Sequence, residues 1–176
     1  RGYLRERSLR IRFKMVEEIN NQTDFISQVD NMISPVSTSR AREISKNSFV
    51  SDFSYRPMRE MEVGFKFEVA RSLDQYPALP STVDLNSFIL RSTYSFENTG
   101  RLRVEIERTE LTSSSSEYNI PFEVLRGNVI GKNYFWRVFF DFRVSSLIQT
   151  SVSYYARKLG GSRVIHTMRT EAKAYF

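Results

Sequence analysis

Residues 61–70 read MEVGFKFEVA, and this stretch decides the fold class. Apolar and charged side chains alternate in it, so that Met61, Val63, Phe65, Phe67 and Val69 are set against Glu62, Lys66 and Glu68. Successive side chains of a β-strand point to opposite faces of a sheet. The alternation therefore predicts a strand with one apolar face and one charged face.

The same period of two recurs along most of the chain. It is found at about 8–15, 49–55, 88–97, 101–107, 134–144, 148–154 and 164–176. Together with residues 60–69, these segments predict about eight antiparallel strands. Several of them reach the ~9–11 residues that a tilted strand needs to cross a bilayer.

The connections between these strands are expected to alternate in length. Short turns are predicted at 56–59, 98–100 and 145–146, and longer connections at about 17–37, 72–84, 112–133 and 158–163. Outer-membrane barrels combine short periplasmic turns with longer extracellular loops. With eight strands, this pattern predicts that both ends of the chain lie on the periplasmic side, with Phe176 closing a descending last strand.

Composition excludes several classes of function. The chain has no cysteine and one histidine, which excludes disulfides, cysteine nucleophiles and histidine-rich metal sites. Its net charge is +6, but the basic residues recur singly near glutamates, so no contiguous nucleic-acid-binding face is expected. No stretch approaches the ~20 apolar residues of a membrane-spanning helix, whereas a barrel strand exposes only every second residue to lipid.

The two faces of the predicted sheet are expected to meet different surroundings. Aromatic residues near the strand ends, which make up part of an aromatic content of 14%, predict interfacial girdles on an outward face that contains Phe65 and Trp136. Charges of both signs on the other face predict a lumen in which they neutralise each other. This predicted lumen charge ladder consists of Arg101, Arg103, Glu105, Glu107, Arg137, Asp141, Arg143, Arg169, Glu171 and Lys173. A soluble antiparallel binding module would show the same alternation, but with the apolar face turned inward.

His166 is the strongest catalytic candidate. Some outer-membrane acyl hydrolases place a histidine and a serine two positions apart on the lipid-facing surface, but here that position is Met168, so the nucleophile is missing. Paired carboxylates could act as general acid and base, yet neutralisation by neighbouring arginines explains them. We therefore assign no catalytic residue, cofactor or metal site. An outer-membrane enzyme acting on lipid or peptide remains the alternative.

Three stretches resemble outer-membrane barrels common in Bacteroidetes and related Gram-negative bacteria. They are SDFSYRPMREMEVGFKFEVARSLDQYP from Ser51, GKNYFWRVFFDFRVSSLIQTSVSYYAR from Gly131, and VSYYARKLGGSRVIHTMRTEAKAYF from Val152. The resemblance implies an integral outer-membrane protein that contacts outer-membrane lipid. It also implies that the barrel-assembly machinery recognises the last strand through Ala172, Ala174 and Phe176. It carries no catalytic residue to this chain.

The sequence thus predicts a single domain over residues 1–176. The expected fold is an all-β, antiparallel, up-and-down transmembrane barrel of about eight strands, either complete or the C-terminal part of a larger barrel. We expect it in the outer membrane of a Gram-negative bacterium, as a non-enzymatic membrane anchor, scaffold or pore. The sequence leaves the choice among these roles, and the oligomeric state, open.

Overall fold

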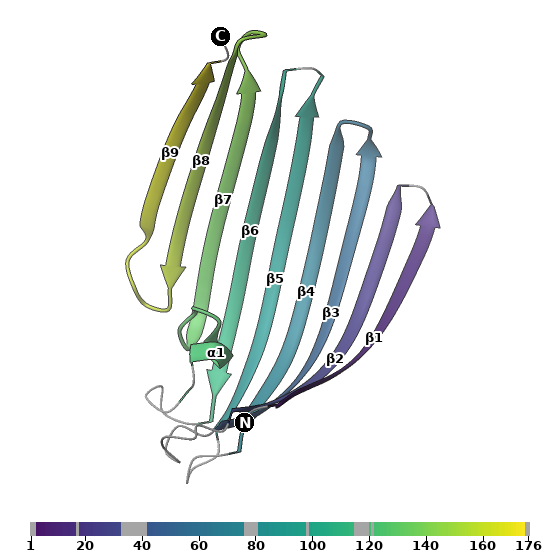
Figure 1. Cartoon of the computed structure of the whole chain (residues 1–176), viewed down its shortest axis with the longest axis vertical. Coiled ribbons are helices and arrows are strands. Elements are labelled where there is room, and N and C mark those ends of the chain that lie inside the picture. The colour runs from purple at the N-terminus through teal and green to yellow at the C-terminus, as the bar shows by residue number, and fades with distance from the viewer. Residues whose placement is uncertain are drawn as a thin grey trace.

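The computed structural model describes residues 3–16, 18–32, 42–75, 81–97, 99–114, 120 and 122–174. These ranges contain one antiparallel sheet in which nine strands lie side by side in chain order (Figure 1). The strands and the single short helix are β1 (Tyr3–Val16), β2 (Ile19–Met32), β3 (Arg42–Met58), β4 (Met61–Asp74), β5 (Ser81–Phe96), β6 (Gly100–Ser113), α1 (Phe122–Leu125), β7 (Gly131–Arg143), β8 (Ile148–Leu159) and β9 (Ile165–Ala174).

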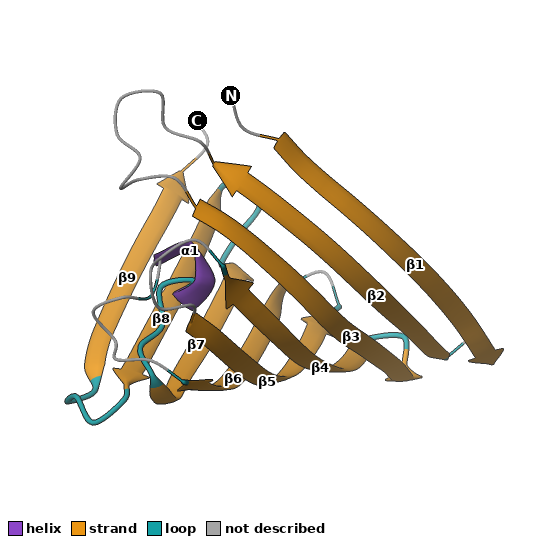
Figure 2. Ribbon diagram, turned by 90° about the horizontal axis from the view of Figure 1, so that it is seen from below, coloured by secondary structure: helices purple, strands orange, loops and turns teal. Residues whose placement is uncertain are grey.

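The sheet is strongly curved. Figure 2 shows it as a trough, with α1 on the concave side. Ile120, Val124 and Leu125 pack there against a buried cluster on the sheet that includes Leu85 and Leu111. These contacts identify the concave face. Because side chains alternate along each strand, all remaining strand residues can then be assigned to the concave or the convex face. No helix in the described part of the chain is long and apolar enough to span a membrane.

The connections divide the sheet into two ends. Those of β1–β2, β3–β4, β5–β6 and β7–β8 are short and lie at one end, the short-turn end. The strand ends that flank the longer connections 33–41, 75–80, 114–130 and 160–164 lie at the other, the long-loop end. The predicted alternation of short and long connections is therefore present, although its boundaries differ from those expected.

The expected loop at 17–37 is wrong, because β2 occupies Ile19–Met32. The connections expected at 72–84 and 112–133 are shorter too, since strands extend into both and α1 lies within the second. The described residues form nine strands rather than the eight predicted, and an odd number of antiparallel strands places the start of β1 and the end of β9 at opposite ends of the sheet. Tyr3 pairs with Asn31 at the long-loop end, whereas Ala174 pairs with Ile148 at the short-turn end. The prediction that both ends lie on one side is thus incorrect.

The nine strands do not close on themselves. Among the described residues, β1 pairs only with β2 and β9 only with β8. All side chains described in β1 and β9 are exposed. The sheet is therefore an open wall with two free strand edges, and the predicted closed barrel is not formed by these strands alone.

The apolar surface of the convex face crosses the strands obliquely, as one row of directly opposite residues on neighbouring strands shows. The row runs from Phe13 through Asn21, Phe53, Phe65, Leu90, Ile106, Trp136 and Ala156 to His166. In β1 the apolar residues Leu9 and Ile11 lie on its long-loop side. In β9 the apolar residue Met168 lies on its short-turn side. A level apolar band thus crosses tilted strands, as the stagger of a barrel requires.

Candidate functional site: the concave wall

All residues of the predicted lumen charge ladder lie on the concave face. The positions of β6 from Arg103 to Leu111 fix this, because Leu111 packs beneath α1 and has the same parity as the charged residues. Arg137 lies directly opposite Glu105, and Asp141 lies opposite Arg101. The wall thus presents charges of both signs to the space that the trough encloses.

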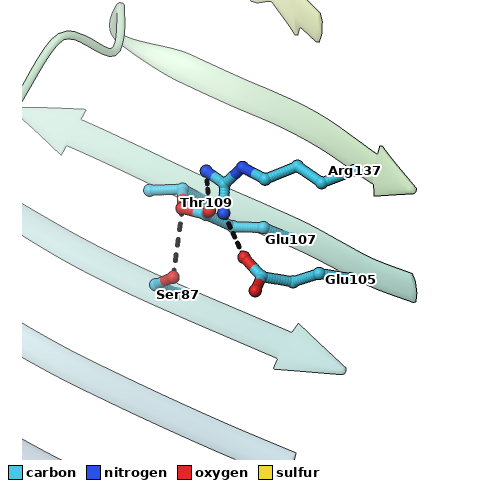
Figure 3. Close-up of polar contacts among 5 residues, drawn as sticks. All are labelled: Ser87, Glu105, Glu107, Thr109 and Arg137. Atoms are coloured by element: carbon cyan, nitrogen blue, oxygen red, sulfur yellow. Dashed lines mark hydrogen bonds and ion pairs between the residues drawn. The ribbon is translucent and has the colours of Figure 1, made fainter. Parts of the chain in front are cut away.

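The densest polar cluster of the ladder surrounds Arg137 of β7 (Figure 3). Its guanidinium pairs with Glu105 and donates from Nη2 to Glu107 Oε2 at 3.0 Å. The Thr109 hydroxyl lies 3.1 Å from Glu107 Oε1 and 3.1 Å from Ser87 Oγ, which extends the network to β5. Because one arginine is shared by two carboxylates, the cluster keeps a net negative charge.

A second ion pair crosses a whole strand. Arg91 of β5 donates from Nη2 to Asp52 Oδ1 of β3 at 2.5 Å, although β4 lies between them. Gly64 of β4, directly opposite Arg91, makes this reach feasible. A Cβ at Gly64 would lie only 3.2 Å from Arg91 Nε, so a larger residue would displace the arginine.

The connection that carries α1 is tied to the wall by charge as well as by apolar packing. Arg126 Nη1 lies 2.8 Å from Glu68 Oε1, and Lys46 Nζ lies 4.0 Å from the same oxygen. Partial burial lowers the pKa of the Arg126 guanidinium, which still remains charged at neutral pH. Arg126 and Gly127 both have positive φ, which turns the chain back toward β7. Between α1 and the wall a cavity of about 220 Å³ remains, bordered by Asp30, Lys46 and Arg126 among others.

The remaining ladder residues are less tightly joined. Glu171 of β9 lies 3.4 Å from Lys173 Nζ and 3.9 Å from Arg169 Nη2. The Arg103 guanidinium lies 6.0 Å from the centre of the Phe139 ring. Among the described residues, no ion pair joins Arg101, Asp141 or Arg143. All three residues are exposed, so their charges are accessible to solutes in the concave space.

Along β4–β8 the convex face carries a largely apolar surface, which we call the apolar band. Its aromatic members pack against one another across strands, as Phe65 does on Phe88 with ring centroids 4.4 Å apart. Along the central strands the band includes Met61, Val63, Phe65, Phe67, Val69, Phe88, Leu90, Tyr94, Phe96, Leu102, Val104, Ile106, Tyr134, Trp136, Val138, Phe140, Phe142, Ile148, Val152 and Tyr154.

His166 lies on the convex face at the long-loop end of β9. Its Nδ1 is 2.7 Å from the Tyr154 hydroxyl, and the two rings stack at 25°. The histidine therefore contacts a tyrosine hydroxyl rather than the serine that an acyl hydrolase would need. Ala172 and Ala174 lie on the same face of β9, and Phe176 lies outside the described residues. No cluster of potential metal ligands is present in the described ranges.

Sequence reasoning missed two features of the wall. The Arg91–Asp52 pair depends on Gly64, which interrupts the charged positions of MEVGFKFEVA and was the available signal. The Arg126–Glu68 contact depends on the path of a long connection, for which no periodic pattern exists. Together these contacts shape a charged trough narrowed by α1 at its long-loop end.

The described strands form an antiparallel meander with one apolar and one charged face, a fold similar to that of outer-membrane barrels. No protein-family model and no curated protein matches the chain. Among solved structures it is similar to outer-membrane-expressed OmpT of Vibrio cholerae, with a TM-score of 0.66, 9% identity, and coverage of 98% of this chain and 56% of that one. A second structure, in-vitro folded OmpT of Vibrio cholerae, gives a TM-score of 0.64, 10% identity and the same coverage. The chain spans a little over half the length of both.

Proposed function

We propose that this chain forms part of the wall of a water-filled, non-enzymatic pore in the outer membrane of a Gram-negative bacterium. The observation that carries the proposal is the opposite character of the two faces across the sheet. The apolar band of β4, Met61–Val69, rises about 20 Å at a strand tilt of about 40°, comparable with the ~25 Å apolar band of such barrels. The short-turn end then faces the periplasm.

The two unpaired edges of the sheet are evidence for a larger barrel. In lipid, an unpaired strand edge leaves backbone N–H and C=O groups without partners, at several kcal/mol each. β1 and β9 would therefore pair with further strands in the membrane. If nine strands correspond to 56% of a closed barrel, the whole has roughly sixteen strands. A barrel of that size leaves an aqueous channel, whereas eight strands would be filled by side chains.

The concave wall fits the role of a channel lining. Its charges face the enclosed space, and α1 narrows that space at the long-loop end. Because Arg126 and the Leu85–Leu111 cluster hold α1 against β4–β6, the narrowing is part of the folded wall. Ions would thus pass between α1 and the opposite side of the barrel.

Reconstitution of the purified protein into planar lipid bilayers tests this proposal. We expect stepwise conductance, and migration on gels that changes on heating after detergent extraction. A protein that stays monodisperse at high concentration without detergent would contradict the membrane assignment. If the protein inserts and is heat-modifiable but shows no conductance, its function would be that of an anchor or scaffold instead of a pore.

A further inference from the structure

Basic side chains border the apolar band on the convex face at the long-loop end. Each of five strands contributes one at this border, namely Arg7, Arg71, Arg108, Lys132 and Lys158. At the short-turn border the corresponding strand positions carry apolar residues such as Met61, Phe96 and Phe142. The two margins of the band therefore differ in charge.

These basic residues are not equivalent. Arg71 is neutralised by Asp84, whose carboxylate oxygens lie 2.6 Å and 3.3 Å from the guanidinium. Arg108 lies 3.1 Å from Glu110. No described acid lies within ion-pair distance of Lys132 or Lys158, although Glu110 lies directly opposite Lys132 on the same face. With Glu110 as one acid among the three basic residues Arg108, Lys132 and Lys158, the border of β6–β8 keeps a net charge of +2.

The strand register brings this charge together around one aromatic side chain. Tyr134 lies between Arg108 on β6 and Lys158 on β8, directly opposite both, and Lys132 precedes it by two positions on the same face. Adjacent positions in such a row have Cβ atoms about 5 Å apart. The Tyr134 ring stacks on Trp136 with an interplanar angle of 10° and centroids 6.1 Å apart. The apolar band therefore begins next to these charges and continues toward the short-turn end.

We propose that Lys132, Tyr134 and Lys158 bind the phosphate of a lipid headgroup in the leaflet at the long-loop end. The two lysine ammonium groups supply charge-assisted hydrogen bonds to phosphate oxygens, while Arg108 is paired with Glu110. Trp136 and Val138, below them on the same strand, supply an apolar surface for the acyl chains of the same molecule. At the corresponding border of β4 and β5, Asp84 cancels the charge of Arg71, so the excess of positive charge is confined to β6–β8. The inference rests on the membrane placement proposed above, but not on conduction.

Spin-labelled lipids in nanodiscs test the site. The protein is reconstituted in phosphatidylcholine nanodiscs, and its association with spin-labelled phosphatidic acid is compared with that of spin-labelled phosphatidylcholine. We expect a preference for phosphatidic acid that falls about fivefold for each lysine removed in Lys132→Gln and Lys158→Gln. The matched double variant Lys14→Gln, Lys66→Gln removes the same charge from the concave face and should keep the preference.

The outcomes separate this site from the proposed function. A wild-type protein that inserts and is heat-modifiable, but shows no preference for phosphatidic acid, overturns the lipid site alone. Retention of the preference in the Lys132→Gln, Lys158→Gln variant does the same. Loss of the preference on addition of millimolar inorganic phosphate would assign the site to free phosphate instead. Failure of the wild type to insert would overturn both proposals.

Discussion

The convex and concave faces are built from the same strands, yet they differ at neighbouring residues. On β8, Val152 and Tyr154 belong to the apolar band, whereas Ser151 and Ser153 face the concave side. The mean composition of the strand conceals this difference, because each face takes every second residue. What separates lipid from water in this fold is therefore strand parity, and a slip of one residue would exchange the two environments.

The largest expected effect comes from a charge placed on the wrong face. Val152→Arg puts a guanidinium near the middle of the apolar band of β8. We expect it to lower the free energy of unfolding by about 2–4 kcal/mol, the cost of arginine near the bilayer midplane. Denaturant titration in lipid vesicles, followed by heat-modifiable migration, measures the change.

Ser151→Arg is the matched control for this variant. Its side chain would face the concave side, directly between Asp141 and Glu171. We expect a neutral or slightly stabilising effect because two acids flank the new charge. Equal destabilisation by both variants would mean that parity does not divide lipid from water.

A smaller effect is expected where α1 packs on the concave face. Leu111 is fully buried there, and Leu111→Ala should weaken the docking of α1 by about 2 kcal/mol. Faster proteolysis within 114–130 and a larger single-channel conductance would report it. Leu102→Ala on the same strand lies in the apolar band away from α1. A conductance that changes equally in both variants would exclude α1 as the narrowing element.

The next effect concerns the charge of the wall rather than its packing. Arg137→Ala leaves Glu105 and Glu107 without their shared donor, at a cost of about 1 kcal/mol where water can replace it. The added negative charge should shift the reversal potential in a salt gradient toward cation selectivity. Arg137→Lys should retain most of the original selectivity. An unchanged reversal potential in the alanine variant would remove this cluster from the conducting path.

The smallest effect is expected at the margin of the apolar band. Tyr154→Phe removes the hydroxyl that contacts His166 and should lower the free energy of unfolding by about 1 kcal/mol or less. Tyr155→Phe, the neighbouring change on the concave face, should cost less still. Thermal unfolding followed on gels compares the two. A larger cost at Tyr155 would indicate that the concave side contains the tighter polar contacts.

Clean alternation made β4 and β7 predictable from sequence, because each contrasts apolar with charged side chains. β2 was missed because polar residues interrupt both of its faces, as Asn21, Thr23 and Ser27 do beside Phe25 and Val29 on the convex one. On its convex face Thr23 bonds to Asn21, which in turn lies 3.5 Å from Ser51 of β3. Because these polar side chains hydrogen-bond to one another on the outward face, the hydropathy of the strand does not alternate with a period of two. Omission of this strand then produced the wrong strand count and the wrong placement of the chain ends.

The charge ladder was also accessible from sequence, but only as a set of residues on one parity. Which charges pair depends on register and on the room that small residues leave, as at Gly64 beneath Arg91. The position of α1 depends on how Ile120, Val124 and Leu125 pack against β4–β6. Neither property is local in sequence, and so neither could be derived from a repeating pattern.

The most direct test of the lipid-facing assignment is a nitroxide scan of β7. The chain has no cysteine, so single cysteines at positions 134–142 can be labelled one at a time in the protein reconstituted in lipid. The positions of Tyr134, Trp136, Val138 and Phe140 should be accessible to oxygen dissolved in the bilayer, and those of Phe135, Arg137 and Phe139 to a water-soluble nickel complex. The same alternation with the two sets exchanged, or no alternation, would contradict the proposed membrane wall.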